Sequence, residues 1–346
     1  MTTPNDAPVR TGPPAPPGWG VTLPLPGLTL DRHRFLVERL PELGYTDVWT
    51  AEGGGTDAFT PLAATAAWSS SLRIGTAIVP VQTRGPAVLA QTAATLAQLA
   101  PGRVLLGLGA SVPAHVADIN GIPFEEPFKR TRDVLRFVTR ALRGEHVAGD
   151  FDTFSIAGYQ LPHPPAAPVK VLLGALRPGM LRLGFGEGDG AISNLLLPED
   201  VPKVLAAVGP QPPGKELVVK VFVSPTEDAA HVQRAARPFL AWILNREPYR
   251  KFHEWLGNGE LLRETHRLWA AGDQEGARRA LPEEVVRGLF VSGSPEECRE
   301  QILRYHLPGV TTLQLYVSLP AEVLADRDRL LDVLARLGPA AGRVRP

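Results

Sequence analysis

The chain has a single cysteine, Cys298, among its 346 residues, which excludes an internal disulfide framework. It also has no excess charge of either sign, because 36 Lys and Arg residues balance 36 Asp and Glu residues. A balanced chain carries no electrostatic footprint for nucleic acid or for an anionic membrane surface. We therefore expect a cytoplasmic protein that binds neither.

Several common motifs are missing as well. No apolar run approaches the roughly 20 residues of a membrane span, and the N-terminus lacks a signal-peptide pattern. The histidines show no metal-ligand spacing such as HExxH, so we predict no metal, and no GxSxG marks a hydrolase. The run GFGEGDG (184–190) lies between a predicted helix and a predicted strand, the reverse of the order that phosphate binding needs, and we interpret it as a turn.

The most informative stretch that is present runs from Leu72 to Ser111. It predicts a buried strand over 72–80, an Ala-rich helix over 86–99 and a second buried strand over 103–108. Both strands are nearly continuous apolar runs, as in parallel sheets covered by helices on both faces. Small residues gather where these strands end, which is the edge where α/β folds bind ligands. We interpret this edge as the floor of a cofactor site.

The same alternation continues along the chain. Eight predicted strands alternating with helices indicate an α/β fold, a (β/α)8 TIM barrel, as a single domain over 18–346. An antiparallel hairpin is expected near Gly149-Asp150, and a long helical block over 227–281 adds extra helices in the C-terminal part. Residues 1–17, with six prolines, predict a disordered arm. The long 111–126 loop is expected to have a function.

Four stretches resemble one family, the luciferase-like flavin and deazaflavin oxidoreductases (the luciferase-like monooxygenase superfamily), especially the coenzyme F420-dependent branch of actinobacteria. They are LGYTDVWTAE (43–52), the 74–111 run, LGALRPGMLRLGFGEGDGAISNLLLPED (173–200) and VSGSPEECREQILRYHLPGVTTLQLYV (291–317). The resemblance implies a TIM-barrel enzyme that transfers hydride between F420 and an activated C=C, C=N or C=O of a small-molecule or peptide-derived substrate. A two-component FMNH2 monooxygenase is the alternative, and a non-catalytic flavin-binding barrel is a third reading. The family also implies a homodimer, for which the helical block is a candidate surface, although it could simply cover the barrel.

Three groups of residues are candidates for the cofactor site. Backbone amides and the positive end of a helix dipole favour an anion where strand five meets its helix, and the family holds the cofactor phosphate there. The family also implies a bulge with a non-proline cis peptide in the third strand and small residues after the fourth. The predicted cofactor-binding residues are Gly174, Ala175, Leu176 and Arg177; Thr76, Ala77, Ile78 and Val79; and Gly109, Ala110 and Ser111. An ordinary turn, a plain strand and a capping Ser111 are the respective alternatives.

Two residues are candidates for catalysis, Glu52 and His115. Family members often carry an acidic residue or a histidine where Glu52 ends the second strand. A carboxyl in a largely apolar pocket holds its proton more strongly, which suits it to donate one to the substrate. The family's frequent Asp-His pair is absent, and glycines follow Glu52 instead. Tyr159 and a water molecule are competing donors, and a role for Glu52 in hydrogen bonding alone is the alternative.

Overall fold

The structure is a computed structural model that describes residues 17–53 and 55–341. The N-terminal arm predicted for residues 1–17 lies outside the described residues except for Pro17. No helix in the described ranges is both long enough and apolar enough to cross a bilayer.

The core is a closed ring of parallel strands. In ring order they are β1 (Gly18–Thr22), β2 (Asp47–Thr50), β3 (Arg73–Thr76), β5 (Val104–Gly109), β8 (Lys170–Gly174), β9 (Gly190–Asn194), β10 (Glu216–Ser224) and β12 (Thr312–Val317). Strand β12 pairs with both β10 and β1, which closes the ring. The predicted (β/α)8 barrel is therefore confirmed.

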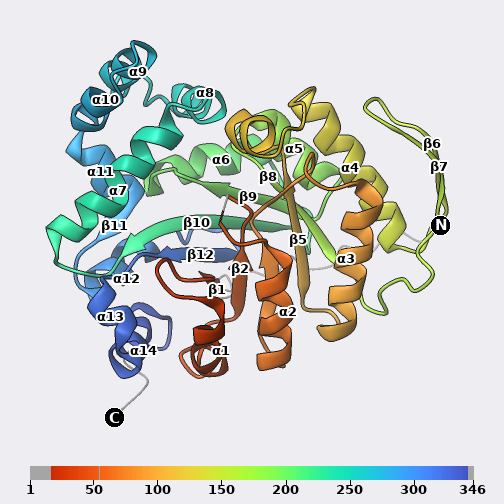
Figure 1. Ribbon diagram of the computed structural model, residues 1–346, viewed down its shortest axis with the longest axis horizontal. Coiled ribbons are helices and arrows are strands. Elements are labelled where there is room, and N and C mark those ends of the chain that lie inside the picture. Colours follow the sequence, from red (N-terminus) through yellow and green to blue (C-terminus); the bar gives the residue numbers. More distant parts are fainter. Residues whose placement is uncertain (1–16, 54, 342–346) are drawn as a thin grey trace, which may run out of the picture.

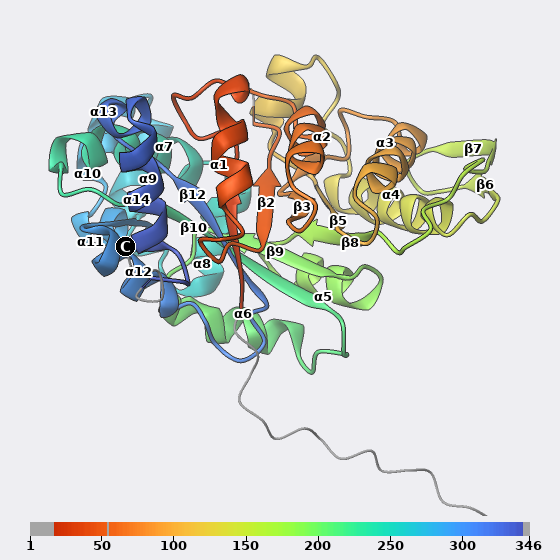
Figure 2. The same ribbon diagram turned by 90° about the horizontal axis from the view of Figure 1, so that it is seen from below.

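Helices surround this ring. They are α1 (Arg34–Arg39), α2 (Phe59–Trp68), α3 (Pro86–Leu99), α4 (Pro127–Leu142), α5 (Pro178–Gly186), α6 (Val201–Val208), α12 (Pro295–Leu303), α13 (Ala321–Ala325) and α14 (Arg327–Leu337), with short turns η1 (Leu30–His33) and η3 (Pro198–Asp200). Figure 2 shows α1, α2 and α3 on one side of the strands and α5 and α6 on the other. The C-terminal helical segment over 321–337 is divided at Asp326, whose side chain accepts from the amides of Asp328 and Arg329 and begins α14.

The predicted third strand is interrupted. Strand β3 ends at Thr76, a separate strand β4 (Val79–Pro80) pairs with β5, and the Ala77–Ile78 peptide bond between them is cis. A non-proline cis bond within 76–79 was expected from the resemblance, and the structure places it at Ala77–Ile78.

A tryptophan fills the barrel interior. Trp49 is fully buried, and a Cβ added at Gly20 or Gly75 would lie 2.6 or 2.5 Å from its ring. Glycine at both positions therefore gives the indole its space.

An ion network closes the end of the barrel where the strands begin. Arg73 pairs there with the buried carboxylates of Asp47 and Glu216, and Lys170 also contacts Glu216 at 2.5 Å. This network stabilises the end of the barrel opposite the cavity described below.

Two additions lie at opposite ends of the molecule (Figures 1 and 2). The predicted hairpin is present as β6 (Val147–Asp150) and β7 (Ser155–Tyr159), an antiparallel pair. The predicted helical block forms α7 (Ala229–Leu244), α8 (Glu247–Leu256), α9 (Arg263–Ala270) and α10 (Gln274–Ala280). It is followed by α11 (Glu283–Leu289) and a short strand, β11 (Phe290–Ser292), that the sequence did not predict. Strand β11 pairs with the end of β10, beyond the residues that β9 covers.

Candidate active site

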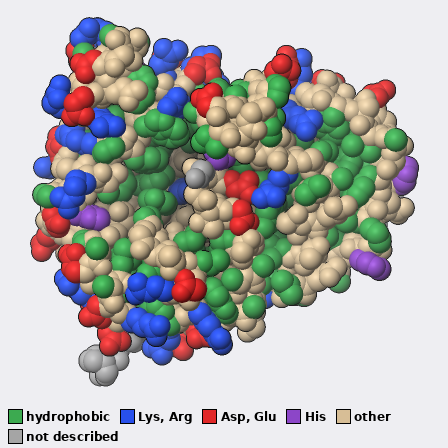
Figure 3. Space-filling model, in the orientation of Figure 1, with side chains coloured by type: hydrophobic (Ala, Val, Ile, Leu, Met, Phe, Trp, Pro, Cys, Tyr) green, Lys and Arg blue, Asp and Glu red, His purple; other side chains and the backbone are tan. Residues whose placement is uncertain are grey.

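A large cavity opens where the barrel strands end. Its volume is about 1530 Å³. Residues from the ends of β1, β2, β5, β8, β9, β10 and β12 line it, together with the β3–β4 connection and helices α7 and α8. Figure 3 shows the surface hollowed near the centre of one face, with hydrophobic side chains along one side of the hollow. Ligand pockets usually measure roughly 300–1,000 Å³, so this cavity has room for a cofactor and a substrate together.

The cavity brings most of the predicted site residues together. Of the thirteen, eleven line it: Glu52, Ala77, Ile78, Gly109, Ala110, Ser111, His115, Gly174, Ala175, Leu176 and Arg177. Thr76 and Val79 are the exceptions, and both are buried beneath it. The Thr76 hydroxyl donates to the Gly107 carbonyl and accepts from the Gly107 amide, at 2.8 Å each. Thr76 and Val79 therefore support the floor instead of facing a ligand.

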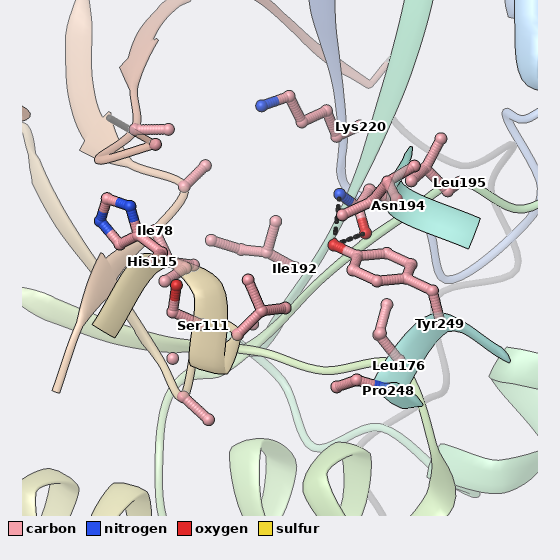
Figure 4. Close-up of a pocket in the computed structure, with 18 of the residues that line it drawn as sticks. Ile78, Ser111, His115, Leu176, Ile192, Asn194, Leu195, Lys220, Pro248 and Tyr249 are labelled. Atoms are coloured by element: carbon pink, nitrogen blue, oxygen red, sulfur yellow. Dashed lines mark hydrogen bonds between the residues drawn. The ribbon is translucent and has the colours of Figure 1, made fainter. Parts of the chain in front are cut away.

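The floor is built around Ile78. A Cβ at Gly109 would lie 3.0 Å from Ile78 Cγ1, and one at Gly174 would lie 3.0 Å from Ile78 Cγ2. The two glycines therefore leave space for the Ile78 side chain itself. At this point of the floor the Ile78 side chain, and not bare backbone, faces the cavity. In Figure 4, Ile78 and His115 occupy one side of the cavity and Asn194 and Tyr249 the other, with Ile192 between them.

The start of α5 is the candidate anion site. Arg177 is its N-cap, and the first intrahelical hydrogen bond is donated by Leu181 to the Arg177 carbonyl. Gly179 and Met180, whose amides precede that bond, line the cavity at the end of the helix where its dipole is positive. The Ala175 amide is different, because it donates to the Ile192 carbonyl at 2.9 Å. Ala175 therefore cannot offer the amide that the sequence analysis assigned to a phosphate, and the next turn of chain supplies the free donors.

Ser111 adopts an unusual backbone conformation just after β5. Its φ is +63°, in the left-handed region that non-glycine residues rarely occupy. Such a conformation costs on the order of 1–3 kcal/mol and tends to occur at functional sites. It turns the chain from β5 into the segment that carries His115, so the Ser111 backbone shapes this wall of the cavity.

Glu52 is not in the apolar surroundings that the sequence analysis assumed. Its carboxylate forms an ion pair with Arg84, and the Ala58 amide lies 3.5 Å from the same oxygen. Arg84 also lies over the Phe59 ring, with its guanidinium carbon 5.1 Å from the ring centroid. The apolar surroundings expected around Glu52 are therefore absent, because a cation contacts the carboxylate.

The other proposed proton donors fall in different places. His115 is half-buried in the cavity wall on a helical turn, η2 (Ala114–Ile119), within what was expected to be a plain loop. Tyr159 belongs to β7 and packs against Phe137 of α4, with ring centroids 5.5 Å apart. The hairpin contributes no residue to the cavity lining, so it forms no wall of this cavity. Tyr159 is thereby removed as a candidate donor.

The side of the cavity formed by β9, β10, β12 and the helical block was not predicted from the sequence. Its polar groups include Lys220, Asn194 and Tyr249, with Glu247, Lys251 and Glu254 of α8, and its aromatic ones are Phe222, Phe239, Trp242, Trp255 and Tyr316. Asn194 Nδ2 and the Tyr249 hydroxyl are 3.3 Å apart, and burial raises the pKa of Tyr249. A signal for Lys220 was present, since it is the one charged residue within the apolar run LVVKVFVS. The helical block over 227–281 was predicted, but the direction in which its aromatic side chains point was not.

The fold and the cavity define an α/β-barrel enzyme with a deep pocket at the carboxyl ends of its strands. Within that class the chain belongs to the luciferase-like monooxygenase family, whose model matches residues 5–312. The predicted family and the prediction of an enzyme are both confirmed.

Individual relatives cover nearly the whole chain. A Mycobacterium tuberculosis protein, named for coenzyme F420-dependent oxidoreductase activity, is 27% identical over 327 residues and covers 85% of this chain and 91% of its own. A 5,10-methylenetetrahydromethanopterin reductase from Archaeoglobus fulgidus is 25% identical over 300 residues, with coverages of 83% and 90%. The solved structure of the coenzyme F420-dependent tetrahydromethanopterin reductase from Methanopyrus kandleri matches with a TM-score of 0.73 at 20% identity, covering 93% of this chain and 98% of its own. At that identity the structural match shows the fold.

Proposed function

We propose that this protein is a coenzyme F420-dependent oxidoreductase that transfers hydride between the deazaflavin and an activated C=C, C=N or C=O of an organic substrate. One observation carries the proposal: three segments far apart in sequence, 77–78, 109–111 and 174–180, line the same cavity at the carboxyl end of the barrel. The names of the M. tuberculosis relative and of the M. kandleri structure support F420 as the cofactor.

The residues present fit a phosphorylated tricyclic cofactor. The amides of Gly179 and Met180, the positive end of α5 and the exposed Arg177 side chain form a donor set suited to a phosphate. Ile78, with the backbone of Gly109 and Gly174 behind it, offers an apolar surface of the kind that a flat ring requires. When bound, reduced F420 supplies a hydride from its C5 carbon.

The protein's own residues have three tasks in this scheme. The start of α5 binds the phosphate, Ile78 supports the ring, and the aromatic side chains of α7 and α8 exclude water from the opposite side. A proton must accompany the hydride to complete reduction. His115 lies in the cavity wall beside Ile78 and is the proposed donor, whereas Glu52, held by Arg84, is assigned to positioning the 51–58 segment.

The direct test is a fluorescence titration of the purified protein with F420 and, separately, with FMN. We expect F420 to bind more tightly, and a Gly179→Pro variant, which lacks one donor amide at the helix start, to bind it more weakly. A matched control is Gly186→Ala, where an added Cβ meets open space at the far end of the same helix. Tight FMN binding with oxygen consumption during FMNH2 turnover would instead establish the monooxygenase alternative.

Two further features belong to the same proposal. We propose that the protein is a homodimer in the cytoplasm, because helical surfaces form dimer contacts in the family that it resembles. Trp242 is 36% exposed on α7 yet also lines the cavity, so the helical block serves the site whether or not it meets a partner. Light scattering of the purified protein tests the dimer.

A further inference from the structure

Lys220 is a charged residue in an unusual place. It lies near the middle of β10, in register with Asn194 of β9 and Gln314 of β12, and is only 8% exposed. Its side chain lines the cavity (Figure 4), extending away from the Asn194–Tyr249 pair. Lysine is almost never this buried unless a partner accompanies it.

No partner accompanies Lys220 within residues 17–53 and 55–341. No carboxylate oxygen there lies within 4.0 Å of its ammonium, and the ammonium donates no hydrogen bond to those residues. Burial alone lowers the pKa of Lys220 to about 8, with no acidic neighbour to oppose the shift. A buried ammonium without a counter-ion is costly, and an anion that enters the cavity would relieve that cost.

The other charged groups of the cavity do not serve this purpose. Glu52 is occupied by Arg84, and Glu247 is paired with Lys251. Glu254 lies 3.9 Å from Arg250. The inner part of the cavity therefore carries positive charge that the described side chains leave uncompensated.

Aromatic rings surround the ammonium. Its nitrogen is 5.5 Å from the centre of the Phe222 ring and 5.6 Å from that of the Tyr316 ring. Such contacts stabilise a cation partly, but rings supply neither a full charge nor a strong hydrogen-bond acceptor. Phe239, which packs on Phe222 at 4.8 Å, extends the aromatic wall toward the helical block. A molecule bound here meets one cation within a mostly apolar, aromatic chamber.

Lys220 also lies apart from the segments assigned to the cofactor. Those segments come from the β3–β4 connection, β5 and the start of α5, whereas Lys220 comes from β10 beside the aromatic wall. The volume of about 1530 Å³ leaves room for a second molecule on this side.

We propose that Lys220 is a specificity-determining residue that binds the carboxylate of the substrate, and that the substrate is an organic acid with an apolar, ring-bearing body. The inference deepens the proposed function, on which it rests for calling this side of the cavity the substrate chamber. The Lys220 ammonium forms an ion pair with the substrate carboxylate. Phe222 and Tyr316 contact the apolar part of the substrate next to that carboxylate.

The test compares acids with amides of the same shape. The probes are benzoate, trans-cinnamate and indole-3-acetate, each with its primary amide, titrated calorimetrically into the full-length protein at pH 7. We expect at least one acid to bind about tenfold more tightly than its amide. Lys220→Met should abolish that preference, and Lys129→Met, which removes an exposed lysine paired with Glu126, should retain it. Equal binding of every acid and amide, absence of binding by all three acids, or a preference that survives in Lys220→Met would overturn the inference.

A parallel F420 titration separates this inference from the proposed function. Lys220→Met should bind F420 as the wild type does, because the cofactor segments are untouched. If the variant loses F420 affinity together with its preference for acids, Lys220 belongs to the cofactor site and the substrate assignment falls. If the wild type prefers acids through Lys220 yet binds neither F420 nor FMN, the proposed function falls and the anion site stands.

Discussion

The hydroxyl of Thr76 holds both backbone groups of Gly107, donating to its carbonyl and accepting from its amide at 2.8 Å each. Strands β3 and β5 pair at Ile74–Val104 and Gly75–Leu105, and this backbone pairing ends before Thr76. A side chain thus continues the connection between the two strands at the point where β3 ends and the cavity floor begins.

Thr76→Val should destabilise the protein. The substitution keeps the shape and burial of the side chain but leaves the Gly107 amide and carbonyl without their partner. A buried polar group that loses its hydrogen bond costs about 1–3 kcal/mol, and we expect the free energy of unfolding in urea to fall by roughly that amount or somewhat more. Thr92→Val is the control, because its hydroxyl donates to the Val88 carbonyl on an exposed face of α3. Equal effects of the two substitutions would contradict the bridging role of Thr76.

Gly174→Ala should weaken F420 binding with little loss of stability. The new Cβ would lie 3.0 Å from Ile78 Cγ2 and 3.7 Å from the Leu108 carbonyl oxygen, so the Ile78 side chain must yield. Since Ile78 lines the cavity, its displacement reaches the cofactor surface, and we expect an affinity loss of about tenfold, equivalent to about 1.4 kcal/mol. Fluorescence titration measures it. Unchanged affinity in a folded Gly174→Ala variant would mean that the ring does not rest on Ile78.

The Glu52–Arg84 ion pair should show energetic coupling. The side chains are 12% and 28% exposed, so the pair is shielded enough to matter. Glu52→Gln and Arg84→Met are each expected to lower the free energy of unfolding by about 1–3 kcal/mol, and the double variant by less than their sum. Urea unfolding of the four proteins gives the coupling energy. Strict additivity would show that the two side chains do not depend on each other.

Lys220→Met should stabilise the protein at neutral pH. Burial lowers the pKa of Lys220 from 10.5 to about 8. Between these values the unfolded chain holds a proton that the folded chain has released, so stability rises with pH from about 8 to 10.5. Below pH 8 the folded protein bears the whole cost of the buried ammonium, on the order of 3 kcal/mol. Methionine removes that cost.

Urea unfolding at pH 7 and at pH 10 checks this prediction. The gain from Lys220→Met should be large at pH 7 and should shrink toward pH 10, while Lys129→Met should change little at either pH. The remaining titratable side chains of the cavity are the same in both proteins: Glu52, His115, Arg177, Glu247, Tyr249, Lys251, Glu254 and Tyr316. A loss of stability at pH 7 would mean that Lys220 has a structural partner.

The features predicted correctly from the sequence are those that local patterns encode. Helix α3 was predicted with both its ends because Pro86 begins it and the Pro101-Gly102 turn follows it. The alternation of strands with helices predicted the closed ring. In such a parallel ring the carboxyl ends of β2, β5 and β8 lie at the same rim. That is why residues as distant as Glu52 and Arg177 line one cavity.

The features that were not predicted depend on the paths of the loops, which bring together residues far apart in the sequence. Arg84 meets Glu52 because the chain after β4 turns back toward the end of β2, and no spacing rule relates positions 52 and 84. The hairpin was recognised, yet its packing on Phe137 directs it away from the cavity. Lys220 stood out as a charge in an apolar strand, but only the three-dimensional arrangement reveals that no acidic side chain of residues 17–53 and 55–341 pairs with it.

Helices α7 and α8 supply the outer wall of the chamber from one uninterrupted segment, joined to the barrel only through β10 and the helices that follow. The proposed phosphate site at the start of α5 is built from another part of the chain. Exchanging residues 229–256 for the equivalent stretch of a homologue should therefore change which substrates the enzyme accepts and leave its choice of cofactor unchanged. Residues 229–256 therefore form a segment that can change, in evolution or by design, independently of the proposed cofactor site.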